Sequence, residues 1–235
     1  MKKITITQIS EKKIKAGNPL LQMEDFPNEL SFDEGELVEL VDSRQKFVAK
    51  AYLAKQNKGV GWVFSLDNAD SFNEAFFKKQ FEKAKRKRTD LQSDPETTTY
   101  RLFNAEGDGI PGVTIDHYDG FAVVSWYSEG IFRYQTAIIA AFQAVFPETK
   151  GIYEKFRYQR KDGLISRYVR GDAAPTPLIV KENSINYATY LDDGLMTGIF
   201  LDQREVRGAL TERYAAGKRV LNTFSYTGAF SVAAA

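Results

Sequence analysis

The chain has 235 residues, of which 43% are hydrophobic and 13% aromatic, so global disorder is excluded and the length suffices for two small domains and the start of a third. Because it has no cysteine and a single histidine, His117, the sequence also excludes disulfides, thiol nucleophiles, thiolate metal sites and multi-histidine metal centres. The net charge is +1, and neither a signal peptide nor an apolar run of membrane-spanning length is present, so we expect a cytoplasmic protein without a metal or a membrane partner.

The first 70 residues have the pattern of a small β-rich unit. Apolar and polar residues alternate near the start, and short runs rich in β-branched and aromatic residues follow. Several short strands separated by polar turns predict a small barrel or sandwich rather than alternating strands and helices. The strands that we expect cover residues 4–7, 37–41, 47–53 and 60–64.

Residues 71–88 predict an amphipathic helix that ends in the basic run KAKRKR. A local basic surface of this kind would suit nucleic-acid phosphates, and an ordinary solvated helix face is the alternative. The side chains that we expect to contact phosphates are Lys85, Arg86, Lys87 and Arg88. Residues 91–99, which contain Asp94–Pro95, break the helical pattern, and we place the first domain boundary there.

A second unit mixes strands with one clear helix. Strands at 113–116 and 121–126 flank an Asp119–Gly120 turn and predict a hairpin, and residues 131–146 predict an amphipathic helix. Because helices and strands do not alternate strictly, this unit is assigned to the α+β class. Further strands are expected at 151–156, 164–169, 178–181 and 185–191.

Residues 107–112 spell G-x-G-x-x-G, but we interpret them as a tight turn. A dinucleotide fingerprint needs a strand before it and a helix after it, whereas Pro111 and the run VTID predict a turn that enters a strand. His117 ends that strand without a nucleophile motif beside it, which favours a structural role.

The last forty residues carry two candidate ligand-binding segments. In the first, Asp202, Gln203 and Arg204 stand together at an expected helix start, with Asp202 as the cap and Glu205 three residues later. A helix start with an amide and a guanidinium can hold a carboxylate-bearing ligand, although a capped helix with solvated side chains is the alternative.

The second segment is an expected strand at 220–224, a loop around Gly228 and an opening helix. This order presents backbone N–H groups to a cofactor at the carboxyl end of a strand, although any α/β protein has a small-residue turn after its first strand. Ser225, Tyr226 and Thr227 offer hydroxyls and an aromatic face, which favour S-adenosylmethionine over ATP. The final helix has no polar face and no stop signal by Ala235, so we expect the front part of a longer enzyme.

Taken together, the runs RLFNAEGDGIPGVTIDHYDGFAVVSW, GIYEKF, MTGIFLDQREVR and VLNTFSYTGAFS resemble the RlmI-type family of S-adenosylmethionine-dependent ribosomal RNA methyltransferases. The resemblance runs from about Lys12 to Ala235, and the order and spacing of the runs agree as well. It implies an N-terminal PUA domain, a central α+β domain, a Rossmann-like methyltransferase domain, and 5-methylcytosine formation in large-subunit rRNA.

Position by position, the resemblance implies which residues bind S-adenosylmethionine. Asn222 departs from the family, whose members more often carry Asp there. The catalytic residues, including the cysteine that carbon-5 attack requires, are expected beyond Ala235 and stay unassigned. The implied cofactor residues are Phe200, Asp202, Gln203, Arg204, Asn222, Phe224, Ser225, Tyr226, Thr227 and Gly228.

We therefore expect a multidomain α/β and α+β protein that methylates ribosomal RNA. The expected parts are a small PUA-like β-barrel that binds RNA (1–70), a linker helix (71–96), a central α+β domain (97–182) and the truncated start of a Rossmann-like methyltransferase domain (183–235). The alternatives are a non-catalytic RNA-binding module and a methyltransferase that acts on another substrate. Assembly as a homodimer is left open.

Overall fold

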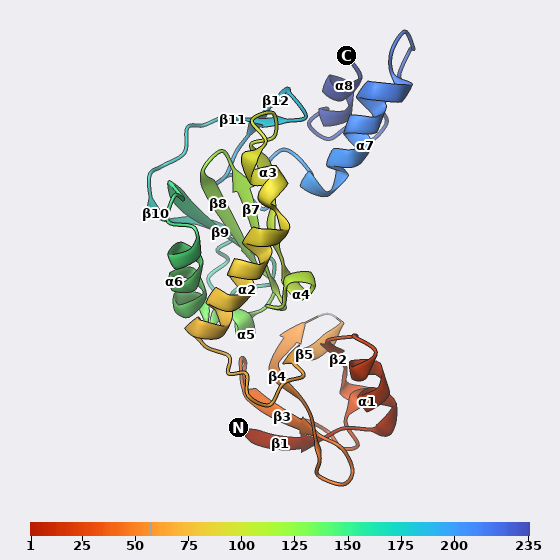
Figure 1. Ribbon diagram of the computed structural model, residues 1–235, viewed down its shortest axis with the longest axis vertical. Coiled ribbons are helices and arrows are strands. Elements are labelled where there is room, and N and C mark those ends of the chain that lie inside the picture. Colours follow the sequence, from red (N-terminus) through yellow and green to blue (C-terminus); the bar gives the residue numbers. More distant parts are fainter. Residues whose placement is uncertain (57) are drawn as a thin grey trace.

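The computed structural model describes residues 1–56 and 58–235, and Figure 1 shows the first sheet and the C-terminal helices at opposite ends of an elongated molecule. The first sheet contains five strands in the order β1-β3-β4-β5-β2. Only β1 and β3 run parallel, and the other neighbours are antiparallel. These strands are β1 (Lys2–Thr5), β2 (Leu20–Leu21), β3 (Leu37–Val41), β4 (Phe47–Gln56) and β5 (Gly59–Ser65).

The expected barrel is wrong for this first sheet. Strands β1 and β2 form its two edges and do not pair with each other within the described residues, so the sheet is open. A helix that the sequence analysis did not predict, α1 (Gln8–Lys15), and a 3-10 turn, η1 (Met23–Asp25), lie between β1 and β3 in sequence. Thr7 caps α1, since its Oγ1 accepts a hydrogen bond from the Ser10 N–H at 3.2 Å.

The second sheet also has five strands, in the order β10-β9-β8-β7-β6. The hairpin of β7 and β8 confirms the expected one, and β8 and β9 run parallel because helices connect them. The segment at 107–112 enters β7 through a left-handed Gly109 (φ 91°), which agrees with a turn. The strands are β6 (Thr99–Asn104), β7 (Val113–Tyr118), β8 (Phe121–Trp126), β9 (Gly151–Phe156) and β10 (Ser166–Gly171).

Two long helices, α2 (Glu74–Lys87) and α6 (Gln135–Val145), pack together on one face of the second sheet (Figure 1). The expected helix at 131–146 is instead divided, because α5 (Glu129–Phe132) ends before α6 begins. Short helices α3 (Thr89–Ser93) and α4 (Ala105–Asp108) complete this region. The hydrophobic core beneath α2 and α6 also includes Tyr52, Trp62 and Phe64 of the first sheet, so the two sheets share one core.

A two-stranded hairpin packs against the opposite side of the second sheet. Val180 and Tyr187 of this hairpin share a buried cluster with Tyr118 and Tyr153 of the sheet. The hairpin consists of β11 (Leu178–Glu182) and β12 (Ile185–Thr189), and the chain then enters the C-terminal elements. No helix of the described residues is long and apolar enough to cross a membrane.

The C-terminal elements differ from two expectations. The helix start at Asp202 is a 3-10 turn, η2 (Leu201–Gln203), followed by α7 (Arg204–Ala209) and the π-helical η3 (Leu210–Tyr214). Gln203, not Asp202, precedes α7, and its side chain makes no cap hydrogen bond. Residues 220–224 form no strand, because no described strand lies beside them to supply hydrogen bonds, and α8 (Ala229–Ala234) follows.

Candidate cofactor-binding site

The two segments singled out in the sequence meet at one pocket of about 260 Å³. Thr227 Oγ1 donates a hydrogen bond to the carbonyl of Gly198 at 2.6 Å, and the rings of Phe200 and Tyr226 lie 5.3 Å apart. Seven of the ten expected cofactor residues line this pocket: Phe200, Gln203, Asn222, Phe224, Ser225, Tyr226 and Thr227.

The loop from Asn222 to Gly228 has an unusual backbone. Phe224, Tyr226 and Gly228 have φ values of 56°, 53° and 84°, in the left-handed region that non-glycine residues seldom adopt. Backbone of this kind concentrates at ligand sites, where strain is retained for a role in binding. The conformation leaves the Phe224 side chain fully exposed, while Asn222 is held by a 2.8 Å hydrogen bond from Nδ2 to the Ser231 hydroxyl.

Arg207 is a pocket-lining residue that the sequence analysis missed. Its side chain is 2% exposed, and its Nε and Nη2 donate to the two carboxylate oxygens of Glu182 at 2.6 and 2.7 Å. Nη2 also donates to the Phe200 carbonyl at 2.7 Å. Arg207 therefore ties the first segment to β11. Glu182 lies 25 residues earlier in the chain, and no local pattern indicates the pairing.

Three of the expected residues lie outside the pocket wall. Arg204 turns to its neighbour and pairs with Glu205 at the surface. Asp202 lines a smaller adjacent cavity of about 70 Å³. Gly228 precedes α8 with its left-handed backbone and does not line the pocket either.

The adjacent cavity gathers charged groups from the second sheet. Arg101 pairs with Asp116, and burial raises the pKa of Asp116 despite the opposing effect of that guanidinium. Lys155 is fully buried, and burial lowers its pKa to about 8. Its Nζ donates to the Gly194 carbonyl at 2.6 Å. Because Phe200 lines both cavities, this charged group borders the candidate cofactor pocket.

The basic run at the end of α2 is largely engaged within the molecule. Lys87 and Arg88 both pair with the buried Asp108, at 2.9 and 2.6 Å. Lys85 donates to the Val145 carbonyl at 2.8 Å. Arg86 is exposed, and its side chain has no hydrogen-bond or ion-pair partner among residues 1–56 and 58–235. RNA binding by the run stays a prediction, and Arg86 is the member that is free to make it.

His117 makes contacts that fit the expected structural role. Its Nε2 accepts a hydrogen bond from the Gly120 N–H at 3.2 Å, and its ring stacks on Tyr100 with centroids 5.0 Å apart. Burial lowers the pKa of His117 to about 4.

Comparison with known proteins agrees with this arrangement. Residues 4–66 match the PUA-like domain family, and residues 132–235 match the S-adenosylmethionine-dependent methyltransferase family. The chain is 45% identical over 239 residues to the Bacillus subtilis protein named "Putative ribosomal RNA large subunit methyltransferase YwbD". It is 36% identical over 204 residues to ribosomal RNA large subunit methyltransferase I of Cronobacter sakazakii.

A solved structure described as "a putative methyltransferase complexed with SAH" has 46% sequence identity to the chain and a TM-score of 0.93, and the match covers all of this chain and 60% of that one. The match to the Bacillus relative covers 100% of this chain and 60% of that protein. The match to the Cronobacter relative covers 85% of this chain and 51% of that protein. The PUA-like match, the methyltransferase match and these relatives together place the chain in the RlmI-type family of S-adenosylmethionine-dependent methyltransferases.

Proposed function

We propose that this chain is part of an enzyme that transfers a methyl group from S-adenosylmethionine to RNA, with carbon 5 of a cytosine in large-subunit rRNA as the target. The observation that carries the proposal is the single pocket that Arg207 and residues from the two expected cofactor segments line together. The names of the Bacillus and Cronobacter relatives support ribosomal RNA as the substrate class. Such a substrate is met in the cytoplasm, where we propose that the protein acts.

The side chains around this pocket fit a ligand made of an amino acid joined to a nucleoside. Gln203 and Asn222 contribute amides, Ser225 and Thr227 hydroxyls, and Tyr226 an aromatic face. Small-molecule sites combine an apolar surface with a few polar groups that fix orientation. The cofactor, when bound, supplies a methyl group activated by its sulfonium. The residues of this chain bind and orient it, and no catalytic residue is assigned among them.

The pocket also limits which residue would hold the ligand's carboxylate. The Arg207 guanidinium is already paired with Glu182, and Arg204 points to Glu205 at the surface. Gln203 is the remaining polar side chain of the first segment on the pocket wall. We therefore assign Gln203 to the amino-acid end of the cofactor, with Asp202 and Arg204 flanking the site.

The division of the chain into parts belongs to the same proposal. Residues 1–70 would be the PUA-like domain, 71–96 the linker helix, 97–182 the central domain and 183–235 the beginning of the methyltransferase domain. The open first sheet supports the first part, and the second sheet supports the central domain. The linker helix contains α2, which packs on α6, and the boundary after residue 182 falls at the turn of the β11–β12 hairpin.

Calorimetry with S-adenosylhomocysteine on the full-length protein tests the proposal. Gln203→Ala should weaken binding several-fold, since it removes one polar contact, and should leave the melting temperature unchanged because a half-buried polar side chain adds little packing. Glu205→Ala, a neighbouring exposed change outside the pocket wall, is the matched control.

Two outcomes would contradict this assignment. An unchanged affinity together with a melting temperature lowered by several degrees would make Gln203 a structural residue. Wild-type protein that binds RNA but neither S-adenosylmethionine nor S-adenosylhomocysteine would be a non-catalytic RNA-binding module.

A further inference from the structure

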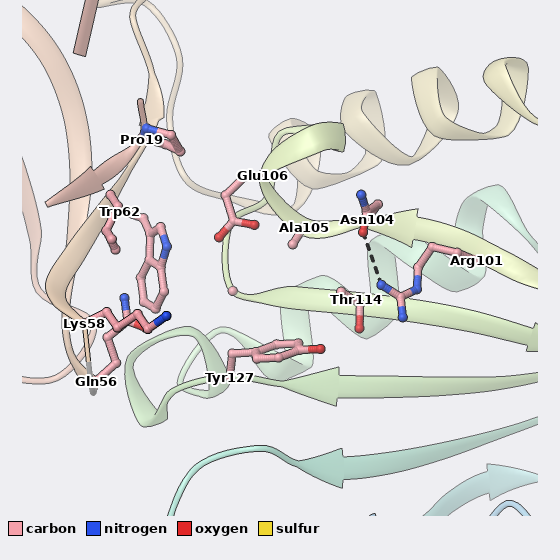
Figure 2. A pocket seen from close by; sticks show the side chains of 12 residues that line it. Pro19, Gln56, Lys58, Trp62, Arg101, Asn104, Ala105, Glu106, Thr114 and Tyr127 are labelled. Carbon is pink, nitrogen blue, oxygen red and sulfur yellow. Dashed lines mark hydrogen bonds between the residues drawn. The ribbon is translucent and has the colours of Figure 1, made fainter. Parts of the chain in front are cut away.

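A second pocket, larger than the cofactor pocket, lies where the first sheet meets the second (Figure 2). Its volume is about 430 Å³. Trp62 and Lys58 reach it from the first sheet and its β4–β5 connection, and Arg101, Thr114 and Tyr127 reach it from the second sheet and the end of β8. None of these side chains belongs to the residues assigned to the cofactor.

Two aromatic side chains form part of its wall. Trp62 is 5% exposed and stacks on Tyr52 with ring centroids 5.4 Å apart, so its position is fixed by the shared core. Tyr127 is 39% exposed and comes from the opposite sheet. Aromatic faces of this kind are stacking surfaces for planar ligands, since every nucleobase has a π-face.

The wall also holds polar atoms whose hydrogen bonds are unused. Thr114 is 4% exposed, and its Oγ1 has no hydrogen-bond partner among the residues that the structure describes. Gln56 Nε2, a donor on the same wall, likewise has no hydrogen-bond partner among the described residues. Buried polar atoms cost free energy when unpaired, so two of them on one pocket wall point to a ligand with donors and acceptors.

Charges around the pocket restrict the ligand further. Lys58 is exposed and has no carboxylate partner in the described part of the chain, whereas Arg101 is held by Asp116. The Glu106 carboxylate stands on the same wall, which disfavours a small free anion at the bottom of the pocket. A neutral planar group attached to an external phosphate satisfies both observations.

We propose, resting on the proposed function, that this pocket takes one unpaired nucleobase of the RNA substrate. The base stacks on Tyr127 beside Trp62, its edge meets Thr114 and Gln56, and the phosphate next to it meets Lys58. Arg101 lines both this pocket and the charged cavity that borders the cofactor site, so the RNA chain can continue from one to the other. The bound base is therefore a neighbour of the methylated nucleotide in the same strand.

The first test compares binding of an unstructured RNA oligonucleotide, followed by fluorescence anisotropy, to the full-length protein and its variants. Tyr127→Ala should weaken binding about five-fold or more through lost stacking, without changing the salt dependence. Lys58→Ala should reduce the salt slope by about one, because one phosphate contact is lost. Tyr190→Ala, which removes a tyrosine of the same 39% exposure that lines neither pocket, should bind like wild type.

The second test asks whether the pocket contacts a base. RNA carrying 4-thiouridine should cross-link to Tyr127 or Trp62 on irradiation, and an oligonucleotide with abasic positions should bind wild type and Tyr127→Ala equally. Thr114→Val, which keeps the side-chain shape, should reduce the preference among oligonucleotides of different base composition. Melting temperatures of all variants identify any that are unfolded, and Thr114→Val and Lys58→Ala keep the test valid if Tyr127→Ala unfolds.

Calorimetry with S-adenosylhomocysteine separates failure of this inference from failure of the proposed function. Variants that bind RNA like wild type, or cross-links confined to other surfaces, would overturn the base-binding pocket while the methyltransferase proposal stands. Loss of S-adenosylhomocysteine binding in wild type would overturn the proposed function instead.

Discussion

The buried pair of Arg207 and Glu182 links the stability of the C-terminal elements to the shape of the cofactor pocket. Both side chains are almost completely buried, and the third hydrogen bond of the guanidinium goes to the Phe200 carbonyl. A buried charge is tolerated when it is paired and fully hydrogen-bonded, and removing one partner leaves the other uncompensated. The pair therefore fixes the main chain of the first cofactor segment.

We expect Glu182→Gln to lower the free energy of unfolding by about 3 kcal/mol and to weaken S-adenosylhomocysteine binding. The double change Glu182→Leu with Arg207→Met should recover much of the stability, because no unpaired charge remains. It should not recover cofactor affinity, because nothing then holds the Phe200 carbonyl. Urea unfolding and calorimetry measure the two effects, and a double variant with wild-type affinity would contradict the positioning role.

His117 gives the folded protein a pH dependence of known sign. Burial lowers its pKa from 6.5 to about 4, so between these values the unfolded chain binds a proton that the folded chain does not. The free energy of unfolding should therefore fall as the pH drops from 6.5 to about 4. His117→Gln, which keeps a neutral acceptor for the Gly120 N–H, should show a smaller fall in urea titrations across this range. Equal pH slopes for the two proteins would count against a His117 that stays neutral in the folded protein.

Among the secondary-structure elements, those with strong local patterns follow the sequence closely. Strand β3 has the expected bounds, and α2 begins three residues inside the expected helix because Asn73 caps it with its side-chain oxygen. Contacts between distant parts of the chain decide the remainder. The Tyr134 hydroxyl donates to the Gly35 carbonyl of the first domain at 2.6 Å, at the point where the expected helix divides into α5 and α6. The spacing of hydrophobic residues within one segment cannot predict a contact with a distant part of the chain.

The failure of the strand at 220–224 has a similar cause. Its apolar residues are typical of a buried strand, yet Leu221 is 87% exposed because no described strand pairs with it. Strand pairing requires two segments, so the composition of one segment predicts only its tendency to form a strand.

Single substitutions in the basic end of α2 should distinguish the residue that is free to bind phosphate from those that stabilise the fold. Arg86→Ala should reduce the salt slope of RNA binding by about one, since its guanidinium is free to meet a phosphate. Lys87→Ala should instead lower stability modestly, because the buried Asp108 loses one of its two cation partners. Filter binding over a salt series and thermal unfolding distinguish them. If the slope is unchanged in Arg86→Ala and in the four-residue alanine variant of 85–88, the run does not contact RNA phosphates.

For the molecule as a whole, local sequence predicted the candidate site better than the arrangement around it. Both candidate cofactor segments were expected because hydroxyls, amides and small residues lie close together in the chain. In the structure, residues of the two segments line one pocket. The partner of Arg207 and the larger pocket were not expected, because each is built from residues far apart in sequence. Both features can be recognised only once the packing of the sheets is known.

The core shared by the two sheets has one more consequence. The Tyr52 hydroxyl donates to the Pro111 carbonyl at 2.9 Å. An added Cβ at Gly130 of α5 would lie 2.5 Å from the Ala54 side chain, so the first sheet is in close contact with the segments that flank the second sheet. Strand β7 runs from Thr114 in the larger pocket to Tyr118 beside the charged cavity, a separation of about 13 Å at roughly 3.3 Å per residue. That is about four stacked nucleotides at 3.4 Å each. Under the proposal that the larger pocket holds a base, this fixed spacing would set how far along the RNA the strand runs before it reaches the charged cavity beside the candidate cofactor pocket.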